Sequence, residues 1–229
     1  MTLIPFNLFG ILAVLGAAIY AVGDVLLLAS KASLDEYPKL KPFAKLLSDA
    51  EKMVVLSPTR LMWGALIGVF TTPLILFGFW HAAQGLSGAN EWAVLVTFFL
   101  FAFATIIGTF VHGSFFYMGE YVHALNDVNE SSQGVIAKML ERHKKIMVIT
   151  YVPLLAFIIS ASILFSVLTA SGKTLYPIWM AGITPLKMTI VWMLGKRILP
   201  QFIRDWTEGA GFNIAYMAFF FCTTITLWK

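Results

Sequence analysis

The sequence predicts an all-α, polytopic membrane protein with six transmembrane helices and two amphipathic helices in its cytoplasmic connections. Hydrophobic residues make up 59% of the 229 positions and charged residues 12%, whereas soluble domains are about half apolar and a quarter charged. The mean hydropathy is correspondingly high, at +0.82. The apolar residues also gather in long stretches, and most charged residues lie between them. These observations predict one integral membrane domain over residues 1–229.

Six stretches are long enough to cross a bilayer, which takes about 20 mostly apolar residues. They cover about 4–29, 61–83, 92–117, 146–170, 176–194 and 212–228. The first has no basic segment before it and no small-residue cleavage site after it, so we expect a retained span rather than a removable signal peptide. Ser57-Pro58-Thr59 is typical of a helix start and precedes the second stretch. The helix of the third stretch can continue to His123.

The Lys and Arg residues predict the orientation of the spans. The first, third and fifth connections hold six, four and three of the 16 Lys and Arg residues, whereas the second has none and the fourth has only Lys173. By the positive-inside rule, the three basic connections are cytoplasmic and both termini lie outside. The same distribution accounts for the net charge of +4, so that charge does not predict a nucleic-acid partner.

Two of the cytoplasmic connections contain amphipathic stretches. Apolar residues recur at helical spacing between Phe43 and Val54, and again between Val135 and Leu140, with charged residues on the other side of each helix. We expect both helices to rest on the membrane surface or to cap the bundle. The alternative is that they gate an opening on the cytoplasmic side.

The second and fifth spans share a local pattern. Thr72-Pro73-Leu74 and Thr184-Pro185-Leu186 are each followed by a tryptophan seven residues after the proline. In a chain of three plus three spans these would be corresponding helices of opposite direction, as in transporters built from inverted repeats with broken helices. Proline is also common in membrane helices, so a chance match is the alternative interpretation.

A polar stripe on the third span indicates a site inside the bundle. Its members advance by three or four positions and therefore share one helix face. They are Thr105, Gly108, Thr109, His112, Phe116, Gly119 or Glu120, and His123. Asp24, Lys187 and Asn213 on other spans favour the same cytoplasmic half of the membrane. A charge at membrane depth costs about 2.5–3.5 kcal/mol on insertion scales, so such residues usually face a cavity or a partner.

We therefore expect a functional site near the cytoplasmic end of the bundle. Asp24, His112 and Glu120 are the candidates for acid–base catalysis. The candidates for binding a ligand are Tyr20, Arg60, Phe116, His123, Lys187, Asn213 and Tyr216. Plainer interpretations stay open: Asp24 can be half of a structural ion pair with Lys187 or a histidine, His112 a hydrogen-bonded core residue, and Glu120 and His123 interfacial residues in water.

His81 lies beside Trp80 at the outer end of the second span. We interpret it as an interface anchor. Because it is at the opposite end of the membrane from the cytoplasmic half, it cannot share a site with His112.

The sequence predicts no metal ion and no cofactor. His112 and His123 lie eleven positions apart, too far to share one ion on a regular helix, and neither HxxxH nor HExxH occurs. A bis-His haem would need two histidines at equal depth on different spans, which the chain lacks. Phosphate-binding loops and the G-x-S-x-G motif are also absent. Cys222 is the only cysteine, which excludes an intramolecular disulfide, and we expect it to be a small buried residue.

Four short motifs stand out along the chain. They are the run from Tyr20 to Asp24 with its glycine before the aspartate, Arg60-Leu61, Gly78-Phe79-Trp80, and His112-Gly113. In these motifs the chain resembles an uncharacterised bacterial family of six-span membrane proteins, and the resemblance covers most of its length. It implies the fold and a location in the bacterial cytoplasmic membrane, but it implies no activity.

Three classes of function are compatible with these features. The first is a membrane-embedded enzyme with a polar cavity open to the cytoplasm, acting by acid–base chemistry on a lipid-like or amphiphilic, anionic small molecule. The second is a small proton-coupled secondary transporter with inverted 3+3 repeats, in which Asp24 carries the proton and Pro73 and Pro185 mark hinges. The third is a non-catalytic ligand-binding or accessory protein whose polar cluster fixes helix packing. Membrane lipids are expected partners in each case.

Overall fold

The structure, a computed structural model, describes residues 6–48 and 50–228, which form helices and connections without any strand. Four of the described helices have the length and hydropathy to cross a membrane: α1 (Phe6–Leu28), α3 (Pro58–Gln84), α4 (Glu91–Asp127) and α5 (Glu130–Ala170). The apolar helix α8 (Gly211–Thr226) is shorter. The predicted all-α, multi-pass membrane protein is confirmed at this level.

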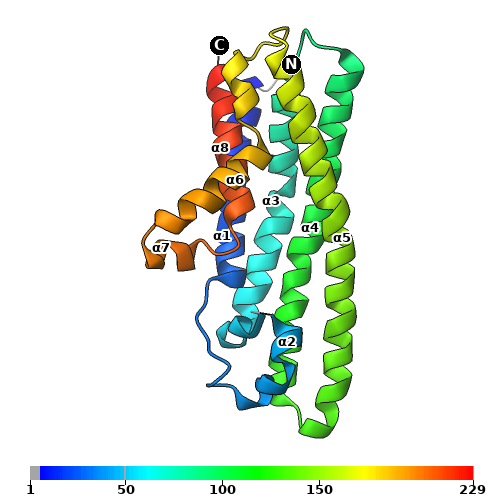
Figure 1. Cartoon of the computed structure of the whole chain (residues 1–229), viewed down its shortest axis with the longest axis vertical. Helices are drawn as coiled ribbons and strands as arrows, with labels where there is room; N and C mark the ends of the chain where they lie inside the picture. The colour runs from blue at the N-terminus through cyan, green and yellow to red at the C-terminus, as the bar shows by residue number, and fades with distance from the viewer. Residues whose placement is uncertain (1–5, 49, 229) are drawn as a thin grey trace.

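The long helices form one elongated bundle (Figure 1). α1 packs against α3 and α8, α3 packs along α4, and α4 packs along α5. α1 begins and α8 ends at the same end of the bundle, which we call the terminal end. The connection after α1 and the α4–α5 connection lie at the opposite end (Figure 1), which we call the basic end because of its Lys and Arg residues.

The two longest helices reach beyond the rest of the bundle at the basic end (Figure 1). With 37 and 41 residues, α4 and α5 are about 55 and 60 Å long. The hydrocarbon core of a bilayer is only about 30 Å thick, so both helices extend into the aqueous phase. Residues 135–140, predicted as a separate surface helix, belong to the first turns of α5, which runs unbroken from Glu130.

The connection between α1 and α3 differs from the single amphipathic helix that its pattern predicts. It forms three short helices: η1 (Pro38–Phe43), α2 (Ala44–Leu47) and η2 (Ala50–Val55). Ser48 ends α2 with a left-handed backbone, at a φ of 48°. η1 and η2 pack on α4, so this connection covers the part of α4 that extends beyond the bundle.

The predicted fifth span, 176–194, is not one helix. It divides into η3 (Ile178–Gly182) and α6 (Pro185–Gly195), and the 11 residues of α6 are only about 16 Å long. A proline lacks the N–H that a continuous helix needs, but it fits the first helical turn, so Pro185 starts a new helix. The segment therefore does not supply the full-length helix that the sequence predicts. After it, η4 (Lys196–Ile198) and α7 (Gln201–Trp206) turn sideways from the bundle (Figure 1).

The two Thr-Pro-Leu sequences lie in different helical settings. Pro185 is at the start of α6, whereas Pro73 lies inside the 27-residue α3. The helices that the repeat would pair therefore differ in both length and form. The inverted 3+3 repeat finds no support in these elements.

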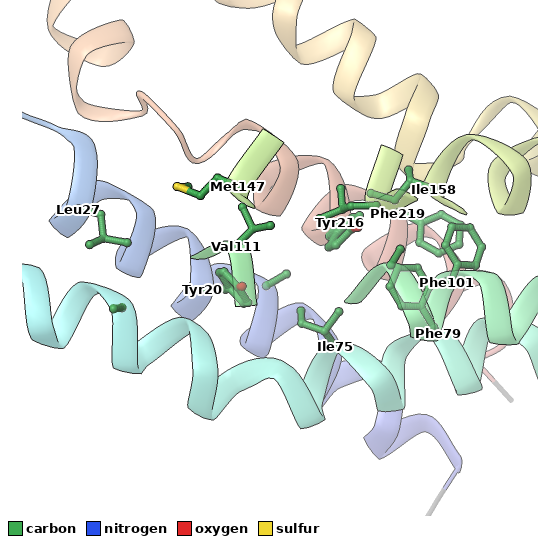
Figure 2. Close-up of a cluster of buried hydrophobic side chains, with 14 of the residues drawn as sticks. Tyr20, Leu27, Ile75, Phe79, Phe101, Val111, Met147, Ile158, Tyr216 and Phe219 are labelled. Carbon is green, nitrogen blue, oxygen red and sulfur yellow. The ribbon is translucent and has the colours of Figure 1, made fainter. Parts of the chain in front are cut away.

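An aromatic cluster fills the bundle between α3, α4 and α8 (Figure 2). The rings of Phe79 and Phe101 stack with their centroids 4.3 Å apart. Phe219 and Phe220 of α8 pack edge-on or tilted against them. All four side chains are fully buried. We call these four residues the aromatic cluster.

Candidate functional site

Two titratable side chains meet in the interior of the bundle. Asp24 comes from the last turns of α1 and His112 from the middle of α4, and both are buried, at 7% and 5% exposure. The His112 Nδ1 lies 3.1 Å from the Asp24 Oδ1. On its other side, the His112 Nε2 lies 2.9 Å from the carbonyl oxygen of Gly64 on α3. The imidazole therefore joins three helices.

These contacts limit the protonation states of the pair. A carbonyl oxygen only accepts hydrogen bonds, so the Nε2 of His112 must carry a hydrogen and donate it to Gly64. The Nδ1 then either donates to an ionised Asp24 or accepts from a protonated one. The pair has no net charge in either state and holds one proton that can move between the two side chains. Neutrality explains how Asp24 is tolerated at membrane depth.

Asn213 and Tyr20 complete the surroundings of the pair. The Asn213 side-chain amide, in the first turn of α8, donates to the Asp24 Oδ2 at 2.7 Å. The Tyr20 ring, one turn before Asp24, meets the His112 ring edge-on with centroids 4.6 Å apart. Both carboxylate oxygens of Asp24 thus have a partner, and each retains a second lone pair for a ligand.

Glycines on α1 and α3 make room for the imidazole. A Cβ atom on Gly68 would lie 2.2 Å from the His112 ring, and a Cβ atom on Gly23 would lie 2.8 Å from the Gly64 carbonyl oxygen. Real side chains do not approach so closely. Small residues at these positions therefore let α1 and α3 pack tightly and let His112 reach between them.

The pair lines a cavity of about 280 Å³ between α1, α3, α4, α5 and α8. Five of the lining residues are labelled in Figure 2: Tyr20, Ile75, Val111, Ile158 and Tyr216. Most of the remaining wall is apolar, with Thr105 and Tyr151 as further polar groups. The volume is close to the lower end of small-molecule pockets, about 300–1,000 Å³.

The cavity has a closed side and a side of partly exposed residues. The closed side is lined by Ile75, Thr105 and Tyr216. One turn nearer the terminal end, the same three helices carry the buried aromatic cluster, which closes the cavity there. Toward the basic end its lining includes Leu28 and Phe212, which are half-buried, and Gly209, which is exposed. We call this side the mouth.

Five of the predicted site residues lie at this cavity: Tyr20, Asp24, His112, Asn213 and Tyr216. The other five do not line it. The Arg60 guanidinium donates to the carbonyl oxygens of Val25, Leu26 and Ala29 at 3.1, 2.9 and 2.7 Å. It therefore caps the end of α1.

Lys187 lies near the terminal end of α5 rather than beside Asp24. Its Nζ donates to the Ser166 Oγ at 3.0 Å and to the Ala181 carbonyl oxygen at 2.6 Å. The Lys187 side chain is exposed, and both of these partners are neutral. Lys187 and Asp24 form no ion pair.

The remaining predicted residues follow α4 toward the basic end. The His123 Nε2 donates to the Leu56 carbonyl oxygen at 2.8 Å. Glu120 has a buried Oε1 without a hydrogen-bond partner in the described part of the chain, and it lies about 12 Å along the helix from His112. Phe116 lines a separate apolar groove of about 860 Å³ between α3 and α4.

His81 is fully buried, which does not agree with its interpretation as an interface anchor. Its ring stacks on Phe6 with centroids 4.4 Å apart, while Trp80 next to it is exposed. Neither ring nitrogen has a hydrogen-bond partner among the described residues. His81 does not line the cavity.

The predicted site residues did not include Tyr151, Gly68 or Thr105. Tyr151 lies in a stretch of α5 that reads as uniformly apolar, and Gly68 acts only by leaving space. Thr105 belongs to the polar stripe, whose spacing had already indicated an inward face. Among the described residues, no group of three His, Cys, Asp or Glu side chains is placed to hold a metal ion.

Residues 5–229 match the profile of DUF6796, a family of unknown function. The chain belongs to DUF6796. Nothing matches among curated proteins or among solved structures. The resemblance predicted an uncharacterised family of membrane proteins. This prediction is confirmed by the family match and by the long apolar helices.

Proposed function

We propose that this DUF6796 protein binds a small amphiphilic molecule in the cavity and that Asp24 and His112 exchange a proton with it. The observation that carries this proposal is that the pair lines an apolar cavity of about 280 Å³. A purely structural ion pair would be enclosed by side chains, because burial of charge is tolerated best when every group is satisfied within the protein.

The chemistry follows from the shared proton. A ligand group that accepts a proton would take it from the neutral pair, and a ligand group that loses one would return it. Asn213 would hold the carboxylate orientation through its hydrogen bond to Oδ2, and Gly64 would hold the imidazole through Nε2. Both are positioning groups, since they act on the pair and not on the ligand.

The wall favours a ligand with a substantial apolar part. Most of the lining is aliphatic or aromatic, and the polar groups gather around Asp24, His112 and Asn213. By the positive-inside rule the mouth faces the cytoplasmic side of a bacterial inner membrane, with both termini outside. An amphiphile in the inner leaflet would reach it from there.

The aromatic cluster favours an enzyme or binding protein over a transporter. A carrier must expose its site to both sides in turn, but the four buried phenylalanines close the cavity toward the terminal end. Pro73 and Pro185 also lie in unlike positions.

Mass spectrometry of lipids tests the proposal. The protein is reconstituted into nanodiscs with a total bacterial lipid extract, and lipids are compared before and after incubation. We expect conversion of a lipid component that falls at least about 100-fold in Asp24→Asn and His112→Gln, the usual contribution of a general acid or base. His81→Gln is the matched control, since it changes a buried histidine outside the cavity.

Conversion that is unchanged in Asp24→Asn would overturn the proposal. A wild-type protein that converts no component contradicts its catalytic part and favours non-catalytic ligand binding. Thermal unfolding of each variant shows whether a loss of conversion reflects a loss of folded protein.

A further inference from the structure

A second cavity of about 240 Å³ lies next to the first, toward the basic end. Leu28 and Phe115 line both cavities, and both side chains are only half-buried. The second cavity also has Lys52, Lys144 and Glu208 in its wall. We call it the lower cavity.

Lys144 brings a positive charge to the lower cavity. It lies on the part of α5 that extends beyond the bundle, and its half-buried Nζ donates to the carbonyl oxygens of Leu46 and Leu47. These carbonyls end the short helix α2 and carry no full charge. Among the described residues, Lys144 forms no salt bridge with a carboxylate.

The other two charged groups nearly cancel each other. The Lys52 Nζ lies 3.5 Å from the Glu208 Oε1. Among the described residues, the wall of the lower cavity has two ammonium groups and one carboxylate. An anion in this cavity would be attracted by Lys144 and repelled by Glu208.

We propose that the lower cavity binds the anionic group of the amphiphile, an oxyanion such as a phosphate, while the uncharged part of the molecule lies beside Asp24 and His112. This rests on the proposed function. Arg60 and Lys187 were the cationic candidates for binding a ligand, but neither side chain lines either cavity. Lys144 has the required charge in the wall of the lower cavity.

Binding of three defined probes to the purified protein in detergent tests this inference. Dioctanoyl phosphatidic acid has an oxyanion and two chains, dioctanoylglycerol has the same chains without the oxyanion, and inorganic phosphate has no chains. We expect phosphatidic acid to bind at least about tenfold more tightly than dioctanoylglycerol, since a hydrogen bond to a charged group contributes about that factor. Binding of phosphate alone would identify a free anion as the ligand, and binding of phosphatidic acid alone a lipid headgroup.

Three variants separate the role of the charge from a loss of structure. Lys144→Gln should weaken phosphatidic acid binding about tenfold, whereas Lys145→Gln, which changes the exposed neighbour, should leave it unchanged. Glu208→Gln removes the repelling carboxylate and should strengthen binding several-fold, which destabilisation cannot do. Equal binding of phosphatidic acid by wild type and Lys144→Gln overturns the inference, as does equal binding of phosphatidic acid and dioctanoylglycerol.

Failure of this inference and failure of the proposed function are distinguishable. Asp24→Asn should abolish lipid conversion but bind phosphatidic acid within about threefold of wild type, because it leaves Lys144 in place. If Lys144→Gln changes nothing while Asp24→Asn still abolishes conversion, only the anion site is wrong.

Discussion

At the scale of single residues, His112 can occupy its position because Gly68 has no side chain. The imidazole occupies the space beside Gly68, and both of its nitrogens face oxygen atoms, one on Asp24 and one on Gly64. A side chain in that space would displace the ring from both partners at once. Of its hydrogen-bond partners in the described part of the chain, Asp24 would then keep the Asn213 amide.

Gly68→Ala should therefore destabilise the protein. A Cβ atom there would lie 2.2 Å from the His112 Cδ2, and overpacking of this kind typically costs about 1–3 kcal/mol. We expect thermal unfolding several degrees lower than in wild type. Gly134→Ala is the matched control, since a Cβ on this α5 glycine meets nothing within 4 Å. Equal unfolding temperatures for Gly68→Ala and wild type would contradict the assigned position of the imidazole.

At the scale of elements, the carbonyl groups at helix ends determine where two of the cationic side chains bind. The last carbonyl groups of a helix have no partner within it, and at the end of α1 Arg60 of α3 satisfies three carbonyl oxygens around that end. Lys144 does the same for α2. Cations are also favoured there by the negative end of the helix dipole.

Arg60→Ala should loosen the end of α1 without unfolding the bundle. The loss of three charge-assisted hydrogen bonds is expected to cost about 2 kcal/mol. Hydrogen–deuterium exchange should then be faster at residues 25–29 than in wild type, while exchange in the middle of α4 stays the same. Arg197→Ala is the control, since Arg197 is exposed on η4. Unchanged exchange at the end of α1 would rule out the capping role.

At the scale of the whole molecule, the bundle has two unlike ends. The terminal end has connections with few charges, and the basic end holds the lysine-rich connection and the extended parts of α4 and α5. The first cavity lies at the last turns of α1, near the middle of α4 and α5, and the lower cavity lies beside it toward the basic end. The side of the membrane that this end faces therefore determines which compartment supplies the ligand.

Cysteine labelling in intact cells tests the orientation. With Cys222→Ser as the background, Ser87→Cys places a thiol in the connection between α3 and α4, and Ser131→Cys places one in the first turn of α5. Both positions are exposed. We expect a membrane-impermeant maleimide to label position 87 only, because the positive-inside rule predicts that the basic end faces the cytoplasm. Labelling at 131 alone would reverse the orientation.

Hydropathy made much of this architecture predictable. The four long helices follow from apolar stretches, and the inward face of α4 follows from the spacing of Thr105 and His112. Asp24 and Asn213 stood out because polar groups are costly at membrane depth. The sequence therefore identified the residues around the cavity better than it identified their partners.

The partners were harder to predict because they are mostly backbone atoms. Arg60, Lys187 and His123 all bind carbonyl oxygens, whose availability depends on where helices end and cross. The full-length fifth span was expected because hydropathy does not register that Pro185 starts a new helix. In the sequence, Lys144 is only one of the basic residues of the third connection, since its setting depends on how the α1–α3 connection folds onto α4 and α5.

The aromatic cluster has a kinetic consequence. Because the aromatic cluster closes the far side, a ligand that enters the cavity at the mouth, beside Leu28 and Phe212, must leave by the same route. Under the proposed catalytic function, the product must therefore leave through the mouth before the next substrate molecule can enter. Product added at the start of a reaction should raise the apparent KM and leave kcat unaltered, the pattern of competitive inhibition.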